Sequence, residues 1–137
     1  MNRAGSVVAL SVFLMINLSS DGVGQNNPAL RLQCDWLSTL DVATMRTSPT
    51  SGSKLISVEV LQGRAGRLKK EGLGAEFAAV VTDEQIEAET EYQMGALRHR
   101  ERITINRYTG KIDNFIVIGK AELVHHGLCK QLPGRMF

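Results

Sequence analysis

The sequence lacks the motifs that mark most enzyme classes. It has no Gly-x-Ser-x-Gly elbow, no His-Glu-x-x-His pair and no glycine loop with the spacing that holds a phosphate. Histidine is scarce, with His99, His125 and His126 alone. Because adjacent residues of a strand point to opposite faces, His125 and His126 would not converge on one metal ion. We therefore predict no catalytic residue, no cofactor and no metal site.

An excess of charge of one sign is also lacking. The chain has 16 lysines and arginines against 14 acidic residues, a formal net charge of +2. This balance is too close to neutral to imply nucleic acid as a partner. Basic side chains gather in one stretch, where Arg64, Arg67, Lys69 and Lys70 could form a patch for an anionic envelope component or an acidic protein surface. A solvated basic loop is the competing interpretation.

Residues 1–24 have the pattern of a secretory signal peptide. Arg3 gives a positive start, and residues 4–18 are uncharged and mostly apolar. Small residues follow, so that cleavage is expected after Gly24 or, alternatively, after Ser20. The apolar run is shorter than the roughly 20 residues of a membrane span. We predict an exported protein, periplasmic or secreted, that would touch a membrane only if this segment were kept as an anchor.

Cysteine is limited to Cys34 and Cys129, near the two ends of residues 25–137. In an oxidising compartment, two cysteines with no third thiol most simply form a disulfide. A catalytic thiol would need a neighbouring base, and a metal site would need more ligands nearby. The sequence therefore predicts a bond between Cys34 and Cys129 that closes a loop of 129 − 34 = 95 residues.

The rest of the chain is predicted to be one β-rich domain, residues 25–137. Apolar residues recur with a period of two from Lys54 to Leu61, and five more segments are strand candidates, which together favour short strands in an antiparallel meander. These segments are Lys54–Leu61, Ala75–Thr82, Glu84–Tyr92, Leu97–Arg107, Lys111–Ile118 and Ala121–His126. The expected architecture is a half-barrel or small sandwich, with any signal-peptide helix outside the fold.

Two segments of this domain read differently from strands. Residues 29–40 space their apolar side chains loosely like a helix, so we expect one short N-terminal helix, or alternatively an irregular segment, tied to the last strand by the disulfide. Residues 62–74 hold four glycines and four basic residues, and we expect a long turn or flexible connection there.

Charged residues predict the register of one hairpin. Glu87, Glu89 and Glu91 would share one face of their strand, and Arg98, Arg100 and Arg102 would share one face of the next. A turn about Met94 and Gly95 would pair Glu91 with Arg98, Glu89 with Arg100, and Glu87 with Arg102. A helix over residues 83–94 is the alternative, because Glu, Gln and Ala are good helix formers.

A second hairpin is indicated around Asn106 and Gly110. The Asn106 side chain can bond to the local backbone, Thr109 can do so more weakly, and Gly110 can adopt the left-handed conformation of a turn. The stretch from Ile105 to Gly110, followed by Gly127-Leu128-Cys129, resembles a pattern in small exported bacterial proteins of unknown function. That resemblance implies a signal peptide and a β-rich body, and it carries over no catalytic residue.

Together these observations favour a non-enzymatic binding or interaction module of the cell envelope, such as a ligand carrier or small inhibitor. The alternative is a small hydrolase or metal-dependent enzyme that uses His99, His125 or His126 with a glutamate. The sequence does not identify the partner.

Overall fold

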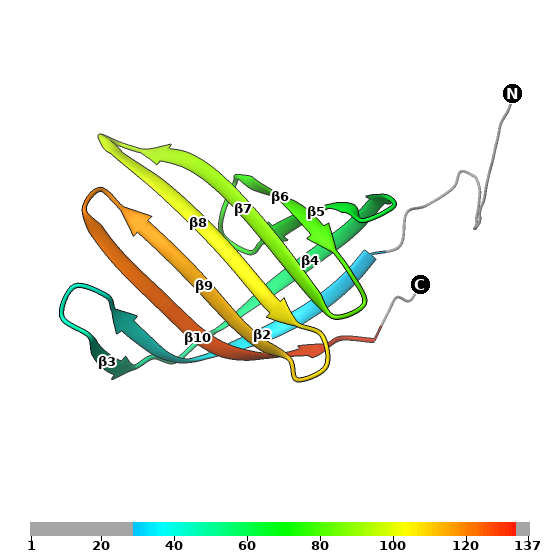
Figure 1. Cartoon of the computed structure of the whole chain (residues 1–137), viewed down its shortest axis with the longest axis horizontal. Helices are drawn as coiled ribbons and strands as arrows, with labels where there is room; N and C mark the ends of the chain where they lie inside the picture. Colours follow the sequence, from blue (N-terminus) through cyan, green and yellow to red (C-terminus); the bar gives the residue numbers. More distant parts are fainter. Residues whose placement is uncertain (1–28, 134–137) are drawn as a thin grey trace, which may run out of the picture.

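The structure is a computed structural model that describes residues 29–133, so the predicted signal peptide lies outside the described residues. Nine antiparallel strands follow one another in this part of the chain (Figure 1). They are β2 (Ala29–Asp41), β3 (Arg46–Pro49), β4 (Ser53–Gln62), β5 (Ala65–Lys70), β6 (Glu76–Val81), β7 (Gln85–Met94), β8 (Leu97–Asn106), β9 (Lys111–Ile118) and β10 (Ala121–Gln131). From β4 to β10 each strand pairs with the next, which confirms the predicted antiparallel meander.

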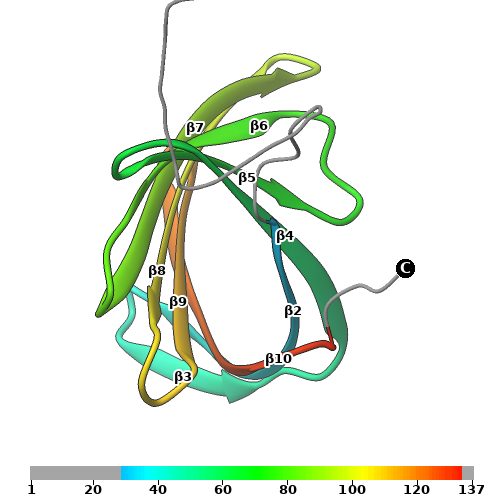
Figure 2. The same ribbon diagram turned by 90° about the vertical axis from the view of Figure 1, so that its right-hand side faces the viewer.

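The sheet closes on itself, and the prediction of a half-barrel or sandwich was therefore wrong. β10 pairs with β2 as well as with β9, and this pairing makes a closed barrel of eight strands, seen nearly end-on in Figure 2. β3 stays outside the ring and pairs with β2. Closure satisfies the edges that a half-barrel would leave exposed. It depends on pairing the first strand with the last, which no local pattern reveals.

The predicted N-terminal helix is also corrected, because residues 29–41 form strand β2. Its helix-like spacing comes from a bulge: His126 pairs with Ser38, but Gly127 pairs with Trp36, so Leu37 is an extra residue. The bulge shifts the alternation of side chains by one position. Pairing with β4 on one side and β10 on the other favours a strand over the local spacing.

Strand β5 lies in the segment that was expected to be a flexible connection. Gly66, Leu68 and Lys70 alternate inward along it, and Gly66 and Leu68 are buried. A Cβ atom on Gly66 would lie 2.7 Å from the carbonyl oxygen of Glu59, so glycine permits the close approach of β4 and β5. Gly66, one of the glycines that suggested a loop, is therefore part of a packed strand.

The charged hairpin forms between β7 and β8, and the alternative helix over residues 83–94 is absent. Its register differs by two residues from the prediction: Glu91 pairs with Arg100, and Glu89 pairs with Arg102. Met94 pairs with Leu97, so the loop is Gly95-Ala96, with Gly95 at φ 62°. Glycine at the first loop position suits a two-residue type II′ turn. A shift of two keeps every side chain on its predicted face.

The hairpin between β8 and β9 matches its prediction. The Asn106 Oδ1 atom accepts hydrogen bonds from the backbone N–H groups of Tyr108 and Thr109, at 2.9 and 3.0 Å. Gly110 has φ 80°, and a Cβ atom there would lie 2.4 Å from the carbonyl oxygen of Cys129. Gly110 therefore serves both the turn and the contact with β10.

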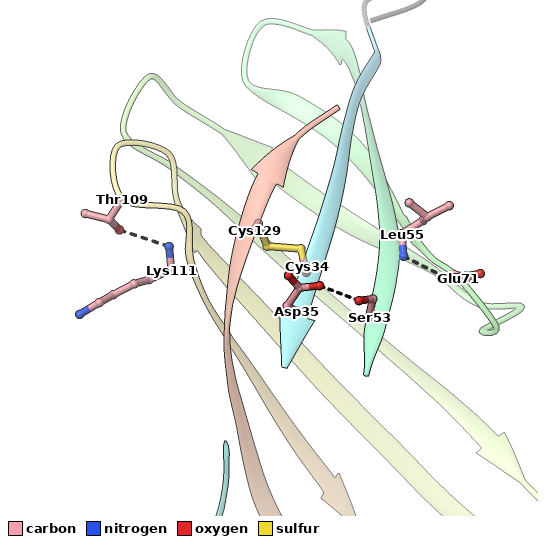
Figure 3. The surroundings of a disulfide bond; sticks show 8 residues. All are labelled: Cys34, Asp35, Ser53, Leu55, Glu71, Thr109, Lys111 and Cys129. Carbon is pink, nitrogen blue, oxygen red and sulfur yellow. Dashed lines mark hydrogen bonds between the residues drawn. A yellow bond between two sulfur atoms is a disulfide. The ribbon is translucent and has the colours of Figure 1, made fainter. Parts of the chain in front are cut away.

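The disulfide between Cys34 and Cys129 is present, as predicted (Figure 3). The two cysteines are direct cross-strand partners on β2 and β10, the pair of strands that closes the barrel. Cys34 is fully buried in the barrel interior. The disulfide thus holds the seam where the ends of the barrel sequence meet.

The barrel interior has an apolar part and an open end. Large buried side chains fill the apolar part: Ile56, Leu68, Phe77, Ile86, Ile103 and Ile112. At the other end β7 continues past its partner, because β6 pairs only with residues 86–89 of β7 and leaves Thr90–Met94 without a partner on that side. Strands β7 to β10 accordingly extend beyond the short β5–β6 hairpin (Figure 1). We call this the open end.

Candidate functional site

Polar side chains form a row across the inner wall near the open end. Asn114 on β9 pairs directly with His125 on β10, which pairs with Thr39 on β2. Asn114 Nδ2 donates to Glu101 Oε1 on β8 at 3.2 Å, and the Tyr92 hydroxyl on β7 donates to Glu101 Oε2. We call these five residues, Tyr92, Glu101, Asn114, His125 and Thr39, the polar row.

Lys70 reaches the polar row from across the barrel. Its strand, β5, is separated from β9 by β6, β7 and β8 on one side and by β4, β2 and β10 on the other. Lys70 Nζ lies 2.6 Å from Glu101 Oε1 and 2.9 Å from Asn114 Oδ1. The side chains of Lys70 and Glu101 are only 12% and 3% exposed. This is a buried ion pair that bridges two walls of the barrel.

The surroundings of Glu101 favour its charged form. Burial alone would raise the pKa of Glu101, but hydrogen bonds from Lys70 and Tyr92, the Lys70 charge and the Asn114 amide together hold it below its ordinary value. Burial, followed by the hydrogen bond to Glu101, raises the pKa of Tyr92 well above its usual range. At neutral pH the pair is a carboxylate that accepts from a neutral phenol.

His125 lies between Asn114 and Thr39 in the polar row. Its Nδ1 atom is 2.7 Å from the Thr39 hydroxyl, which is itself 2.5 Å from the Thr50 hydroxyl. The ring centroid of His125 is 5.7 Å from that of Trp36. Burial, followed by the positive charge of Lys70, lowers the pKa of His125, and the Glu101 charge opposes this only in part.

Aromatic rings flank the polar row on both sides. On one side the rings of Tyr92 and His99 lie with centroids 4.9 Å apart, and on the other side Trp36 lies against His125. All four side chains are half-buried. A few fixed polar groups among aromatic walls are typical of sites for small organic molecules.

The three histidines do not lie together. His99 and His125 belong to the barrel interior, whereas the His126 Nδ1 atom lies 2.6 Å from Asp113 on the outer surface. Within residues 29–133, no cluster of three or more histidine, cysteine or acidic side chains has the geometry to hold a metal ion.

The four residues of the predicted basic patch are divided between the turn and the two faces of β5. Arg64 lies just before the strand, Arg67 and Lys69 face outward, and Lys70 points into the barrel. Arg67 pairs with Glu59 at 2.9 Å and Lys69 with Glu76 at 3.4 Å. An anionic partner for the outward residues stays a prediction.

Hollows lie elsewhere on the barrel. A pocket of about 130 Å³ at the opposite end of the barrel is lined by Leu30, Ile105, Arg107 and Cys129, among others. It is smaller than the roughly 300–1,000 Å³ of most ligand sites. An open depression of about 350 Å³ over β4 and β5 is lined in part by Arg31, Lys69 and Lys70.

Comparisons with known proteins find no matching family model, no similar curated protein and no similar solved structure. In the described part of the chain, no helix is long and apolar enough to cross a membrane. The fold and the site therefore define an eight-stranded antiparallel barrel with a buried ion pair and an aromatic rim at its open end.

The polar row was missed in the sequence, although signals for it were present. Once Arg98, Arg100 and Arg102 are assigned to the outer face, alternation places Glu101 on the inner face beside Ile103. The same alternation places Lys70 inward after Leu68, and Asn114 inward between Ile112 and Ile116. A charged or amide side chain within an apolar row was the available signal.

We expect Trp36 fluorescence to report the protonation of His125. A protonated imidazole quenches a neighbouring indole, and Trp36 is the single tryptophan. Because the pKa of His125 is lowered, the emission should fall with a midpoint below the ordinary value of about 6.5. His125→Gln should abolish this step, and His126→Gln, on the outer face, should leave it unchanged. A midpoint above 6.5 would contradict the described burial.

The lowered pKa of His125 also affects the stability of the fold. A histidine whose folded pKa lies below its unfolded pKa takes up protons more readily in the unfolded chain. His125 should therefore reduce stability as the pH falls below about 6.5, the unfolded value.

Proposed function

We propose that this chain is an exported, non-enzymatic binding protein that holds a small organic molecule at the open end of its barrel. The observation that carries this proposal is the buried pair of Lys70 and Glu101, which lies at the boundary between the apolar interior and the open end. A binding role explains both the polar row and the aromatic rings of Trp36, Tyr92 and His99 beside it.

The energetics of the ion pair support a role beyond stability. Removing two charges from water costs several kcal/mol per ion, and the attraction between them repays this only with good geometry and further hydrogen bonds. Replacing such a pair by neutral residues is often neutral or stabilising. A chain selected only for a stable barrel could have continued its isoleucine and leucine interior through these positions.

The arrangement of the strands supports the same role. Lys70 is the last residue of β5, and β7 to β10 continue beyond it. The half-buried rings of Trp36, Tyr92 and His99 therefore stand beside the buried charges without a complete ring of eight strands around them. A molecule that enters from the open end could contact the half-buried members of the polar row, Tyr92, His125 and Thr39, whereas Glu101 and Asn114 are buried.

Export is part of the proposal. It is supported by the signal-peptide pattern of residues 1–24 and by the disulfide, since disulfides persist in oxidising compartments. The resemblance to small exported bacterial proteins agrees with this placement.

A screen of small metabolites by ¹H–¹⁵N NMR tests the proposal. Binding molecules should shift the signals of Trp36, His99 and His125, and leave Leu30 and Gln131 at the opposite end unchanged. The neutral variant Lys70→Met/Glu101→Gln should lose this binding while staying folded. Molecules that bind only at the opposite end or on the outer wall would contradict the proposal, and so would turnover of a bound molecule.

A further inference from the structure

We infer that the ligand is a small planar carboxylate, whose anionic group binds the remaining N–H groups of Lys70, Asn114 and His125 while its ring lies between Trp36 and Tyr92. This inference rests on the proposed function and specifies its ligand class. It follows from counting which hydrogen-bonding atoms of the polar row already have partners.

Most acceptor sites of Glu101 and Asn114 are already used. Glu101 Oε1 accepts from Lys70 and Asn114, and Glu101 Oε2 accepts from Tyr92. Asn114 Oδ1 accepts from Lys70. A ligand that offers mainly N–H or O–H donors would therefore find few free carboxylate or amide oxygens.

Donor groups remain. Lys70 has three N–H groups and makes two hydrogen bonds among the described residues, and Asn114 has a second N–H on its amide. If Thr50 donates to Thr39 and Thr39 donates to His125 Nδ1, both hydroxyls are satisfied and Nε2 carries the hydrogen. Three N–H groups from three strands are then left without an acceptor among the described residues, and a carboxylate accepts several donors at once.

The charges at the open end agree with this count. Alternation places Lys54 on the same face of β4 as Ile56, and Lys54 has no ion pair among the described residues. The Lys54 Nζ atom lies beside Gly72, in the turn that follows β5, so it adds a second positive charge near that of Lys70. Two other carboxylates already accept backbone hydrogen bonds: Glu71, next to Lys70, accepts from the Leu55 N–H, and Asp41 accepts from the Ala43 N–H. A ligand anion would balance the second lysine.

The flanking rings define the shape of the ligand. Trp36 beside His125 and Tyr92 beside His99 offer flat faces from β2 and β7, at the two ends of the polar row. Stacking of a planar ring is favourable beyond its buried area. A planar body is therefore preferred to a saturated chain or ring.

Three probes of similar size test the inference: benzoate, its neutral analogue benzamide and the non-planar cyclohexanecarboxylate. Each is titrated into the full exported domain while the NMR signals of Trp36, His99 and His125 are followed. We expect benzoate to bind at the open end about tenfold more tightly than benzamide, the difference between a charge-assisted and a neutral hydrogen bond. It should also bind more tightly than cyclohexanecarboxylate.

A matched pair of variants adds a second readout. Lys54→Met should weaken benzoate binding severalfold, whereas Lys120→Met, an exposed lysine in the β9–β10 turn, should leave it unchanged. Equal binding of benzamide and benzoate at the open end would overturn the inference and leave the proposed function standing. No shift with benzoate would also overturn it, and the metabolite screen would then decide the proposed function separately.

Discussion

Lys70→Met should destabilise the protein by about 3–5 kcal/mol, the usual effect of removing one partner of a buried ion pair. The substitution leaves Glu101, 3% exposed, without its cation, while Tyr92 and Asn114 still bond to it. Glu101→Gln should have a smaller effect, because Lys70 lies at the end of β5 and its long side chain can turn toward solvent. Urea unfolding, monitored by Trp36 fluorescence, measures the loss of unfolding free energy in each variant.

The sign of the pH dependence should reverse in Lys70→Met. In the native protein the pKa of Glu101 is lowered, so its contribution to stability is complete above the unfolded value of about 4.3 and is lost as the pH falls through the folded value. Without Lys70, burial, the largest influence on Glu101, is opposed only by the hydrogen bonds from Tyr92 and Asn114, so we expect the pKa of Glu101 to be raised. The variant should then lose stability as the pH rises above about 4.3. A variant whose stability still rises over this range would show that the lysine does not set the charge of Glu101.

Removing the disulfide should have an effect of similar size. The chain-entropy relation gives roughly 4–5 kcal/mol for a loop of this length, and the bond spans a sequence separation of 95 residues. Because Cys34 and Cys129 are cross-strand partners on the closing seam, Cys34→Ala/Cys129→Ala should also loosen the pairing of β2 with β10. The measurement is urea unfolding with and without the two substitutions.

Reduction supplies the control for the disulfide prediction. The native protein in a strong reductant should unfold at the same urea concentration as the alanine variant, and the alanine variant should not respond to the reductant. A loss below about 1 kcal/mol would contradict the prediction, since it would mean that the seam is held by strand pairing alone.

Local patterns predicted most of the strands but not the closure of the barrel. Alternation in segments such as Lys111–Ile118 reflects one buried face, and it is a local property of the chain. The pairing of β2 with β10 joins residues about 90 positions apart, so it depends on the whole sheet. The predicted disulfide did bring the two ends together, yet the bulge at Leu37 concealed the first strand.

The site was harder to predict than the fold because its residues come from distant segments. Lys70 follows three other basic residues, and composition placed it in an exposed patch. In the sequence, Glu101 lies between Arg100 and Arg102, whose side chains point outward. The inward direction of Glu101 was visible only through the alternation of side chains along the strand. Their contact crosses the barrel from β5 to β8, and only the closed fold brings it about.

The most direct test of the central claim measures stability and binding in one variant, Lys70→Met/Glu101→Gln. The glutamine amide can accept from Tyr92 and, once the Asn114 amide has turned over, donate to Asn114 Oδ1, so residue 101 stays bonded to both neighbours without charge. We predict a free energy of unfolding within about 1 kcal/mol of the native protein, together with loss of benzoate binding at the open end. A variant that loses several kcal/mol of stability, or that binds benzoate as the native protein does, would contradict the claim that the Lys70–Glu101 pair serves ligand binding.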